Sequence, residues 1–281
     1  MENLKFTILE KKILAPHIIK FKVKSHLIPI NAKPGQFIVV LQDLDSERIP
    51  LTLFNWNEKE NYIEFIFQIV GAQTYKLSQL KEGDTIHSIL GPLGKVILDE
   101  DFDKGLFIGG GLAQCEIYPK LKYYKSKGKK LYTLIGAKTK ELIFLEKELR
   151  ELSEKIFIYT DDGSYQRKGF LTQDLDKILL EEKIDFVYCA GPAIMLKRVS
   201  EITKRFNIKT IVSLNPIMVD ATGLCGACRV IVDGKEKFAC VDGPEFEAHK
   251  VDFDSLILRL NHYKEKEECA YKFLKENLKR E

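Results

Sequence analysis

The sequence has little of what marks a nucleic-acid-binding, membrane-spanning or secreted protein. Its 281 residues include 44 Lys and Arg against 41 Asp and Glu, so the formal charge is only +3. No basic stripe alternates with aromatic residues, as it would on a nucleic-acid surface. The first residues, MENLKFTILEKKIL, are interrupted by charge every few positions and lack the apolar run of a signal peptide or membrane span. We expect a cytoplasmic protein with no nucleic-acid or membrane partner.

Cysteine is also scarce, with six residues in the whole chain. The thiols of a cytoplasmic protein stay reduced, so disulfides are not expected. Three of the six cysteines nevertheless lie close together in the stretch DATGLCGACRVIVDGKEKFAC, at Cys225, Cys228 and Cys240. This clustering favours metal or redox chemistry.

The pattern of strands and helices divides the chain into three segments. Residues 1–98 contain short β-rich runs separated by Pro, Gly, Asn and Asp, which predict an antiparallel barrel or sandwich. In residues 99–215 five strands (GLFIGGG, KLYTLIGA, KIFIYTDD, FVYCAGP and TIVSLN) alternate with helical stretches, which predicts a doubly wound parallel sheet. Residues 216–281 hold the three clustered cysteines, followed by one long charged helix.

Three loops of the predicted parallel sheet have the composition of a nucleotide site. They follow strand ends and contain Gly109, Gly110 and Gly111; Asp161; and Cys189, Gly191 and Pro192. Ligands bind at the carboxyl ends of such strands, where glycine lets the backbone approach a pyrophosphate. The spacing is not the G-x-G-x-x-G fingerprint, because Gln114 occupies the position of the last glycine. A tight strand-to-helix turn is the alternative interpretation of the three glycines.

Two runs in the first segment, RIPLT (48–52) and QIVGAQT (68–74), give these loops a context. With them, the chain resembles the ferredoxin reductase superfamily, in which a flavin-binding barrel precedes a pyridine-nucleotide domain. The resemblance implies an FAD site in which Arg48 neutralises the pyrophosphate and Thr52 lies near the reactive N5 edge of the flavin. The other FAD-binding residues that it implies are Pro50, Leu51, Gln68, Ile69, Val70, Gly71, Gln73 and Thr74. In isolation, each run also fits a strand and turn with a surface arginine.

The same resemblance implies a nicotinamide site. Cys189 is expected beside the nicotinamide, where it would shape the pocket for hydride transfer to FAD. Because the hydride passes directly between the two cofactors, no side-chain acid or base is required. Lys138 and Lys140 follow the second strand and are placed either to meet a 2′-phosphate or to lie in solvent. We expect NAD(H) on resemblance alone.

The clustered cysteines leave open which metal they bind. Zinc is one alternative, completed by an aspartate, but the second C-x2-C or His pair of a zinc ribbon is missing. The glycine-rich loop around Cys225 instead favours a [2Fe–2S] cluster, whose sulfides need inward-pointing backbone amides. Counting back five residues gives Asp220, so D-x4-C-x2-C-x11-C is a plant-type pattern with a carboxylate as first ligand. The alternative is that Asp220 only caps a turn.

The order of barrel, nucleotide sheet and cluster resembles the electron-transfer subunit of dihydroorotate dehydrogenase. The stretches SLNPIMVDATGLCGACRV and FACVDGPEFEAHKVDF are more similar still to the small-subunit family of NADH-dependent ferredoxin:NADP⁺ oxidoreductase, or sulfide dehydrogenase. In that family aspartate is an expected cluster ligand. The chain departs from the family at Ala113, Gln114, Cys115 and Glu116, where the family has a further glycine and Ala-Pro. The detailed nicotinamide contacts are therefore not carried over.

The family resemblance implies an oxidoreductase subunit that exchanges electrons between NAD(H), FAD and a [2Fe–2S] cluster. The expected partner is a larger subunit with FAD and [4Fe–4S] clusters, through which ferredoxin is reached indirectly, in an electron-bifurcating reaction. The alternatives are an equivalent subunit of a dihydroorotate or sulfur-reducing enzyme, and a zinc-stabilised adaptor without enzymatic activity.

Overall fold

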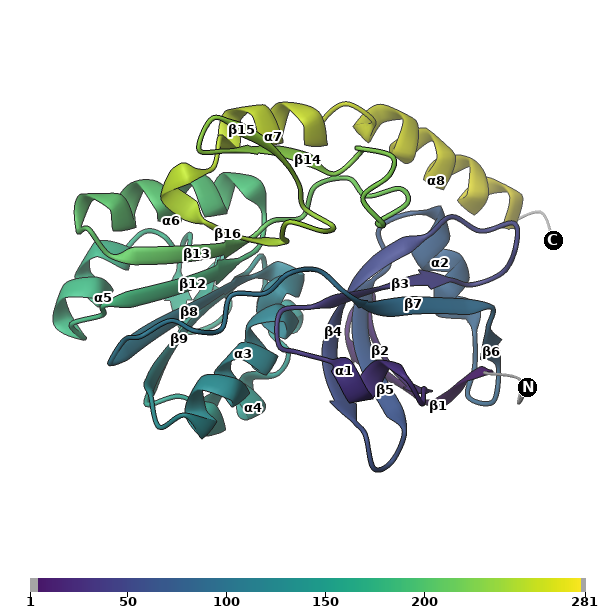
Figure 1. Cartoon of the computed structure of the whole chain (residues 1–281), viewed down its shortest axis with the longest axis horizontal. Helices are drawn as coiled ribbons and strands as arrows, with labels where there is room; N and C mark the ends of the chain where they lie inside the picture. Colours follow the sequence, from purple (N-terminus) through teal and green to yellow (C-terminus); the bar gives the residue numbers. More distant parts are fainter. Residues whose placement is uncertain (1–4, 279–281) are drawn as a thin grey trace.

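The first half of the computed structural model, which describes residues 5–278, is an antiparallel barrel (Figure 1). Its strands are β1 (Phe6–Ala15), β2 (Ile18–Lys24), β3 (Phe37–Leu41), β4 (Ile49–Asn57), β5 (Tyr62–Gln68), β6 (Thr85–Ile86) and β7 (Ser88–Leu93). They are hydrogen-bonded in the order β6-β1-β2-β5-β4-β3-β7. Two short helices, α1 (Ile28–Asn31) and α2 (Ala72–Gln79), lie in the connections.

The core of this barrel is formed by apolar side chains that alternate along the strands. In β2, buried side chains recur with the period of two that a strand imposes. Phe21 of β2 lies edge-to-face with Phe67 of β5, with ring centroids 5.2 Å apart, and both rings are fully buried.

The second half is built on a mixed sheet of seven strands. These are β8 (Lys104–Gly110), β9 (Lys130–Ala137), β10 (Lys155–Thr160), β11 (Arg167–Lys168), β12 (Phe186–Ala190), β13 (Lys209–Ser213) and β16 (Glu245–Glu247). The order is β11-β10-β9-β8-β12-β13-β16, and all neighbours are parallel except β16, which is antiparallel to β13. The strand order reverses direction beside β8, between β9 and β12, where ligands of such sheets bind.

Helices cover both faces of the sheet (Figure 1). They are α3 (Gln114–Ser126) and α4 (Glu146–Leu152) on one face, and α5 (Leu175–Glu181) and α6 (Ala193–Arg205) on the other, with 3₁₀ turns at Gly111–Ala113 and Lys140–Leu142. Successive strand residues serve opposite faces: Leu106 and Ile108 join the α5 and α6 core, whereas Phe107 joins the α3 core. An antiparallel barrel followed in the chain by this doubly wound sheet confirms the predicted fold class.

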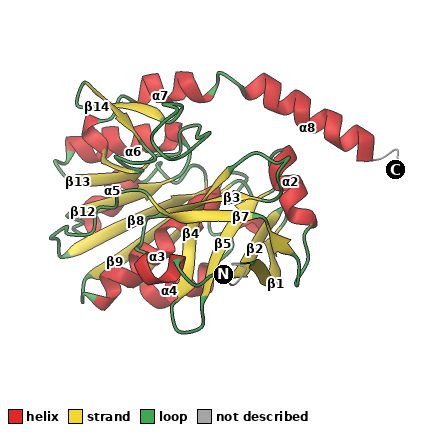
Figure 2. Ribbon diagram, turned by 45° about the vertical axis from the view of Figure 1, so that its right-hand side comes forward, coloured by secondary structure: helices red, strands yellow, loops and turns green. Residues whose placement is uncertain are grey.

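The C-terminal segment does not form a separate layer. It contains a hairpin of β14 (Arg229–Val232) and β15 (Lys235–Phe238), the strand β16, a 3₁₀ turn (Ala248–Lys250), and helices α7 (Phe253–Leu260) and α8 (Lys264–Leu278). Through β16 it adds a strand to the second sheet. Helix α8 follows α7 and extends toward α2 of the barrel (Figure 2). The segment therefore contacts both of the other parts.

Several helices are shorter than the sequence pattern predicts. One of the helical stretches of the second segment, ELIFLEKELREL (141–152), forms a helix only from Glu146, because Leu145 has a left-handed backbone with φ of 63°. The predicted single C-terminal helix is two helices, separated at Asn261, a residue type that commonly ends helices. The ends of the predicted first and third segments, residues 1–4 and 279–281, lie outside the described residues. No helix within residues 5–278 is long and apolar enough to cross a membrane.

Candidate functional site

A cavity of about 180 Å³ lies where the barrel, the nucleotide sheet and the C-terminal segment meet. The barrel contributes the predicted flavin residues Pro50, Leu51 and Thr52, which all line it. They lie on β4, where pairing with β3 sets Thr52 opposite Phe37. The structure thus brings three residues of the predicted FAD motif to a single wall of one cavity.

Arg48, the first residue of the same motif, contacts the cluster loop. Its Nη1 lies 2.6 Å from Oδ1 of Asp220, and the two residues are 172 positions apart in the chain. The other oxygen of the Asp220 carboxylate accepts a hydrogen bond from Thr222. These hydrogen bonds, with the charge of Arg48, hold the pKa of Asp220 below its usual value. The predicted pyrophosphate ligand and the predicted first cluster ligand are therefore neighbours.

The second predicted flavin run, residues 68–74, joins β5 to α2. The Thr74 hydroxyl accepts hydrogen bonds from the backbone N–H groups of Val70 and Gly71, at 3.0 and 3.1 Å, and so fixes the turn before the helix. Gln68 ends β5, and Ile69 donates its N–H to the His17 carbonyl.

One side-chain atom of this run has no partner. The Oε1 atom of Gln73 is buried and accepts no hydrogen bond from any described residue. A buried acceptor without a donor is costly, and a bound polar group would satisfy it. The run therefore fits a ligand that brings hydrogen-bond donors, such as the ribityl or adenosine part of FAD.

Four residues that line the first cavity beyond the barrel were not predicted from the sequence. Glu116 lies in the first turn of α3, Tyr188 on β12, Ser213 at the end of β13, and Met218 in the C-terminal segment. Burial raises the pKa of Glu116 to about 7, against the opposing effect of a hydrogen bond from Ser213. No local motif marks these positions, because α3, β12, β13 and the C-terminal segment each contribute one of them.

Beneath this cavity lies a fully buried ion pair. The Nζ of Lys120 is 2.7 Å from Oε1 of Glu245, and both side chains have no exposed surface. Glu245 also accepts hydrogen bonds from the Ile97 N–H at 2.6 Å and from the Tyr188 hydroxyl at 3.0 Å. Gly35 of the barrel packs directly against it, since a Cβ there would overlap Oε1 of Glu245. The pair therefore connects the barrel, the linker after it, α3, β12 and β16.

A second, larger cavity of about 520 Å³ lies at the carboxyl edge of the parallel sheet. Of the predicted nucleotide residues, Gly110, Gly111, Asp161 and Pro192 line it, together with Lys138. Arg198 and several apolar side chains, including Phe170 and Met195, complete the wall. An apolar cavity with a few charged groups at this edge is typical of a dinucleotide site.

The glycines at this edge are required by space and by conformation. A Cβ on Gly110 would lie 2.5 Å from the Met195 sulfur, and one on Gly109 would lie 3.1 Å from the backbone of the next turn. Gly191 has φ of 149°, and a Cβ there would lie 3.3 Å from Gly110. Gly111 has φ of 59° with open space around it, so its backbone is accessible to a ligand.

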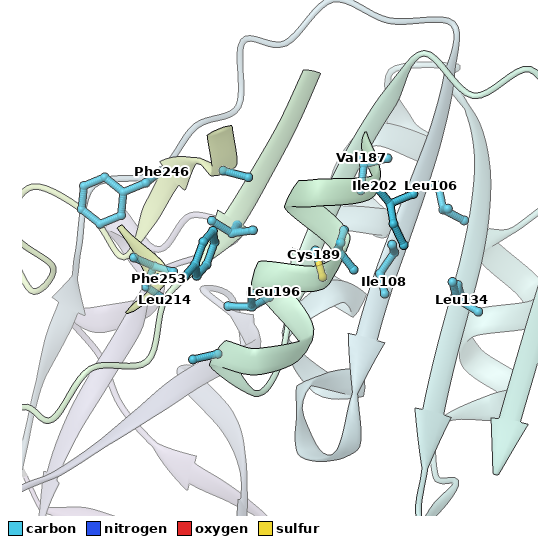
Figure 3. Packing of buried hydrophobic residues seen from close by; sticks show 14 of the residues in the cluster. Leu106, Ile108, Leu134, Val187, Cys189, Leu196, Ile202, Leu214, Phe246 and Phe253 are labelled. Carbon is cyan, nitrogen blue, oxygen red and sulfur yellow. The ribbon is translucent and has the colours of Figure 1, made fainter. Parts of the chain in front are cut away.

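Cys189 lies away from this cavity. Its side chain is fully buried among Leu106, Ile108 and Leu196, as Figure 3 shows, and it is not part of the cavity wall. Burial raises the pKa of its thiol well above the usual value. The structure gives this cysteine the surroundings of a small core residue, and its expected place beside the nicotinamide stays a prediction. The CAGP motif alone does not tell on which face of the sheet the Cys189 side chain is buried.

The four predicted cluster ligands lie on one loop and its hairpin, in two pairs. Cys228 and Cys240 are buried side by side with their sulfurs 3.2 Å apart. Two sulfurs on one tetrahedral metal with bonds of about 2.3 Å lie about 3.8 Å apart, so this spacing is near that of a shared metal. In the other pair, the Cys225 thiol accepts the backbone N–H groups of Ala227 and Asp220, which lower its pKa.

The pairs do not converge on a single metal ion. Within residues 5–278, no three His, Cys, Asp or Glu side chains surround one metal position. A two-iron cluster takes its four ligands as two per iron, and the adjacent sulfurs of Cys228 and Cys240 fit one such pair. Burial beside Cys228 raises the pKa of Cys240 to about 12, so binding there requires a metal that displaces the proton.

Cys115, Cys269 and Lys140 lie away from these sites. Cys115 is buried in α3, where burial raises its pKa, and Cys269 is exposed on α8. The Lys140 ammonium lies over the Tyr165 ring, 5.3 Å from its centroid, and is not part of the nucleotide cavity wall.

Comparison with known proteins agrees with this description of the fold and of the C-terminal segment. Residues 215–252 match the domain family described as the iron-sulfur cluster binding domain of dihydroorotate dehydrogenase B. A dihydroorotate dehydrogenase B (NAD(+)), electron transfer subunit homolog of Thermotoga maritima is 42% identical over 269 residues, which are 95% of each chain. The dihydroorotate dehydrogenase B (NAD(+)), electron transfer subunit of Geobacillus sp. is 32% identical, covering 89% of this chain and 99% of that one.

Among solved structures, the NADH-dependent reduced ferredoxin-NADP oxidoreductase, described for flavin-based electron bifurcation, superposes with a TM-score of 0.89. It is 40% identical and covers 96% of this chain and 97% of that one. Phthalate dioxygenase reductase, with 15% identity and a TM-score of 0.62, shares the fold.

The fold and the paired thiols thus define a ferredoxin-reductase-like oxidoreductase with a C-terminal iron–sulfur domain. The chain belongs to the family of dihydroorotate dehydrogenase B electron transfer subunits. These findings confirm the predicted family and electron-transfer function, and the expected set of FAD, NAD(H) and a [2Fe–2S] cluster agrees with them. The exact segment boundaries and the individual site residues remain predictions.

Proposed function

We propose that the chain passes electrons between NAD(H) and a larger subunit through FAD held at the junction cavity and a [2Fe–2S] cluster on the C-terminal loop. The observation that carries this proposal is the ion pair between Arg48 and Asp220. It sets the flavin motif of the barrel against the cluster loop, and electron transfer between two cofactors requires such proximity. FAD would accept a hydride and release single electrons, which is the form that an iron–sulfur cluster carries.

The barrel residues have distinct roles in this proposal. Pro50, Leu51 and Thr52 form the cavity wall against the flavin ring, and the turn fixed by Thr74 receives the rest of the cofactor. Arg48 is about half exposed, so its free donors can bind the pyrophosphate while Nη1 keeps its contact with Asp220. The backbone of Gly111 and the apolar wall of the larger cavity receive the dinucleotide.

The cluster ligands in this proposal are Asp220, Cys225, Cys228 and Cys240. A carboxylate has several lone pairs, so Asp220 can bind a metal and still accept a hydrogen bond from Arg48. The exposed position of Cys225 places this end of the loop at the protein surface, where electrons can cross to a partner. The partner in this proposal is a larger subunit with its own FAD and [4Fe–4S] clusters, as the family resemblance implies. The name of the relatives, electron transfer subunit, supports the presence of a partner subunit. A partner that acts on dihydroorotate is the second candidate, because the sequence relatives carry that name.

The test is purification of the chain from its native source and identification of what accompanies it. The expected result is a coloured complex with FAD, a [2Fe–2S] cluster and one larger flavoprotein subunit, in which reduced nicotinamide bleaches the flavin. The chain alone should reduce artificial dyes with NADH and should not reduce ferredoxin with NADPH, because its described residues offer one dinucleotide cavity. A colourless chain that holds zinc would contradict the proposal and favour the adaptor.

A further inference from the structure

The first cavity contains an ionisable group for which hydride transfer has no use. Glu116 lies in its wall together with Thr52, the residue expected near the reactive edge of the flavin. Among the described residues that line this cavity, it is the only carboxylic acid. The residue is half-buried in the wall of this cavity.

The Glu116 carboxyl is one end of a hydrogen-bonded series that runs into the protein. Ser213 donates to Glu116 and is also hydrogen-bonded to Tyr188, whose hydroxyl donates to Glu245. Glu245 in turn is held by Lys120 at 2.7 Å. The inner part of this series is fixed by burial, and Glu116 is the member that faces the cavity.

The surroundings of Glu116 bring the pKa of its carboxyl close to neutral pH. Burial and, less strongly, the negative charge of Glu245 on β16 raise the pKa and the hydrogen bond from Ser213 lowers it, which together give a pKa of about 7. Lys120, from the same helix as Glu116, balances most of the Glu245 charge. The Tyr188 hydroxyl from β12 stays protonated, because burial raises its pKa well above the usual value.

Two buried thiols lie on the same elements but pack into other parts of the core. Cys115, next to Glu116 on α3, packs with Phe54 and Phe144, and Cys189, next to Tyr188 on β12, lies in the core on the other face of the sheet. Burial and the charge of Glu116 raise the pKa of both thiols well above the usual value, so neither ionises near neutral pH. Glu116 is thus the group in this region that gains and loses a proton in the physiological range.

We propose that Glu116 takes up a proton from water when FAD in this cavity is reduced, and returns it to water when FAD passes on its two electrons. This inference rests on the proposed function. FAD that has accepted a hydride would carry two added electrons and one added proton, and therefore one added negative charge in the cavity that Glu116 lines. The Glu116 carboxylate would then become a carboxylic acid. When both electrons have left for the iron–sulfur cluster, the flavin proton and the Glu116 proton would both return to water. Thr52 cannot take this role, because a hydroxyl does not ionise near neutral pH.

The proposal predicts that reduction of the flavin is linked to protonation of Glu116. Reduced FAD brings negative charge into the cavity, and a like charge raises the pKa of a carboxyl group. Around pH 8 the parent protein should therefore bind more than one proton for two electrons. One proton for two electrons corresponds to a slope of about 30 mV per pH unit in the reduction potential.

The experiment is a spectroelectrochemical titration of the flavin in the full chain between pH 6.5 and 9. The parent slope should be steeper than the one-proton value above pH 7, and Glu116→Gln should give the one-proton value throughout. Glu58→Gln is the matched control, because Glu58 lies exposed in the β4–β5 turn, and it should behave as the parent.

Further variants keep the test decisive if Glu116→Gln loses FAD. Glu116→Asp keeps a carboxyl group and should keep the steeper slope. Ser213→Ala removes a hydrogen bond that favours the ionised carboxyl, so the bend in the slope should move to higher pH. A parent that holds FAD with only the one-proton slope, or a Ser213→Ala variant with an unmoved bend, would overturn the role of Glu116. A parent that holds no FAD would contradict the proposed function itself.

Discussion

Replacing Lys120 with methionine should destabilise the whole chain. Lys120 is a fully buried lysine whose Nζ lies 2.7 Å from Oε1 and 2.8 Å from Oε2 of Glu245, and 2.8 Å from the Ile97 carbonyl. Methionine fills similar space but leaves Glu245 charged and buried, with only the Ile97 N–H and the Tyr188 hydroxyl as partners. Removing one partner of a buried pair costs about 3–5 kcal/mol of unfolding free energy.

The loss of unfolding free energy in Lys120→Met should depend on pH, because a protonated Glu245 is neutral and can be buried at lower cost. Burial already raises the pKa of Glu245, and loss of the Lys120 charge would raise it further. The unfolded chain has a glutamate pKa of about 4.3. Between that value and the raised folded value, the folded variant binds more protons than the unfolded one, so its stability falls as pH rises. Lys120→Met should therefore be less destabilised at pH 5 than at pH 8.

Urea unfolding followed by circular dichroism at both pH values measures these effects. The double variant Lys120→Met/Glu245→Gln should recover part of the loss and lack the added pH dependence, because the buried charge is gone. Lys177→Met is a control in which an exposed pair with Glu181 is lost, at a cost of about 0.5 kcal/mol or less. If Lys120→Met unfolded within about 0.5 kcal/mol of the parent at pH 8, the ion pair would not hold the three parts together as described.

Two further predictions concern the cofactor ligands. Arg48→Ala should weaken FAD retention by about tenfold to a hundredfold, because a charge-assisted hydrogen bond is worth about 1.5–3 kcal/mol; flavin content after gel filtration measures this, and undiminished flavin would show that the pyrophosphate lies elsewhere. Asp220→Cys should keep a [2Fe–2S] cluster with altered visible and paramagnetic spectra, since sulfur replaces oxygen at equal charge, whereas Asp220→Ala should bind it less stably. Spectra and potentials identical to the parent in both variants would exclude Asp220 as a ligand.

The features that the sequence predicted are those encoded by short stretches of chain. Alternation in β2 and helical periodicity in α6 report burial within one element, so the barrel and the doubly wound sheet were readable in order. The spacing of Cys225, Cys228 and Cys240, with Asp220 before them, lies within 21 residues, and the match over 215–252 confirms an iron–sulfur domain there. The break at Asn261 was missed, because no glycine or proline marks it between the two helices.

Only the tertiary structure decided which distant residues meet. Lys120 lies in a lysine-rich helix, whose composition predicts a solvent-exposed side chain. It is fully buried, because Glu245, 125 positions later in the chain, forms an ion pair with it. Glu116 was recorded only as a departure from a family motif, and it became a candidate proton acceptor when α3, β4 and β13 met around one cavity. A carboxyl group takes its protonation state from the desolvation and charges around it, and these come from parts of the chain that no local pattern connects.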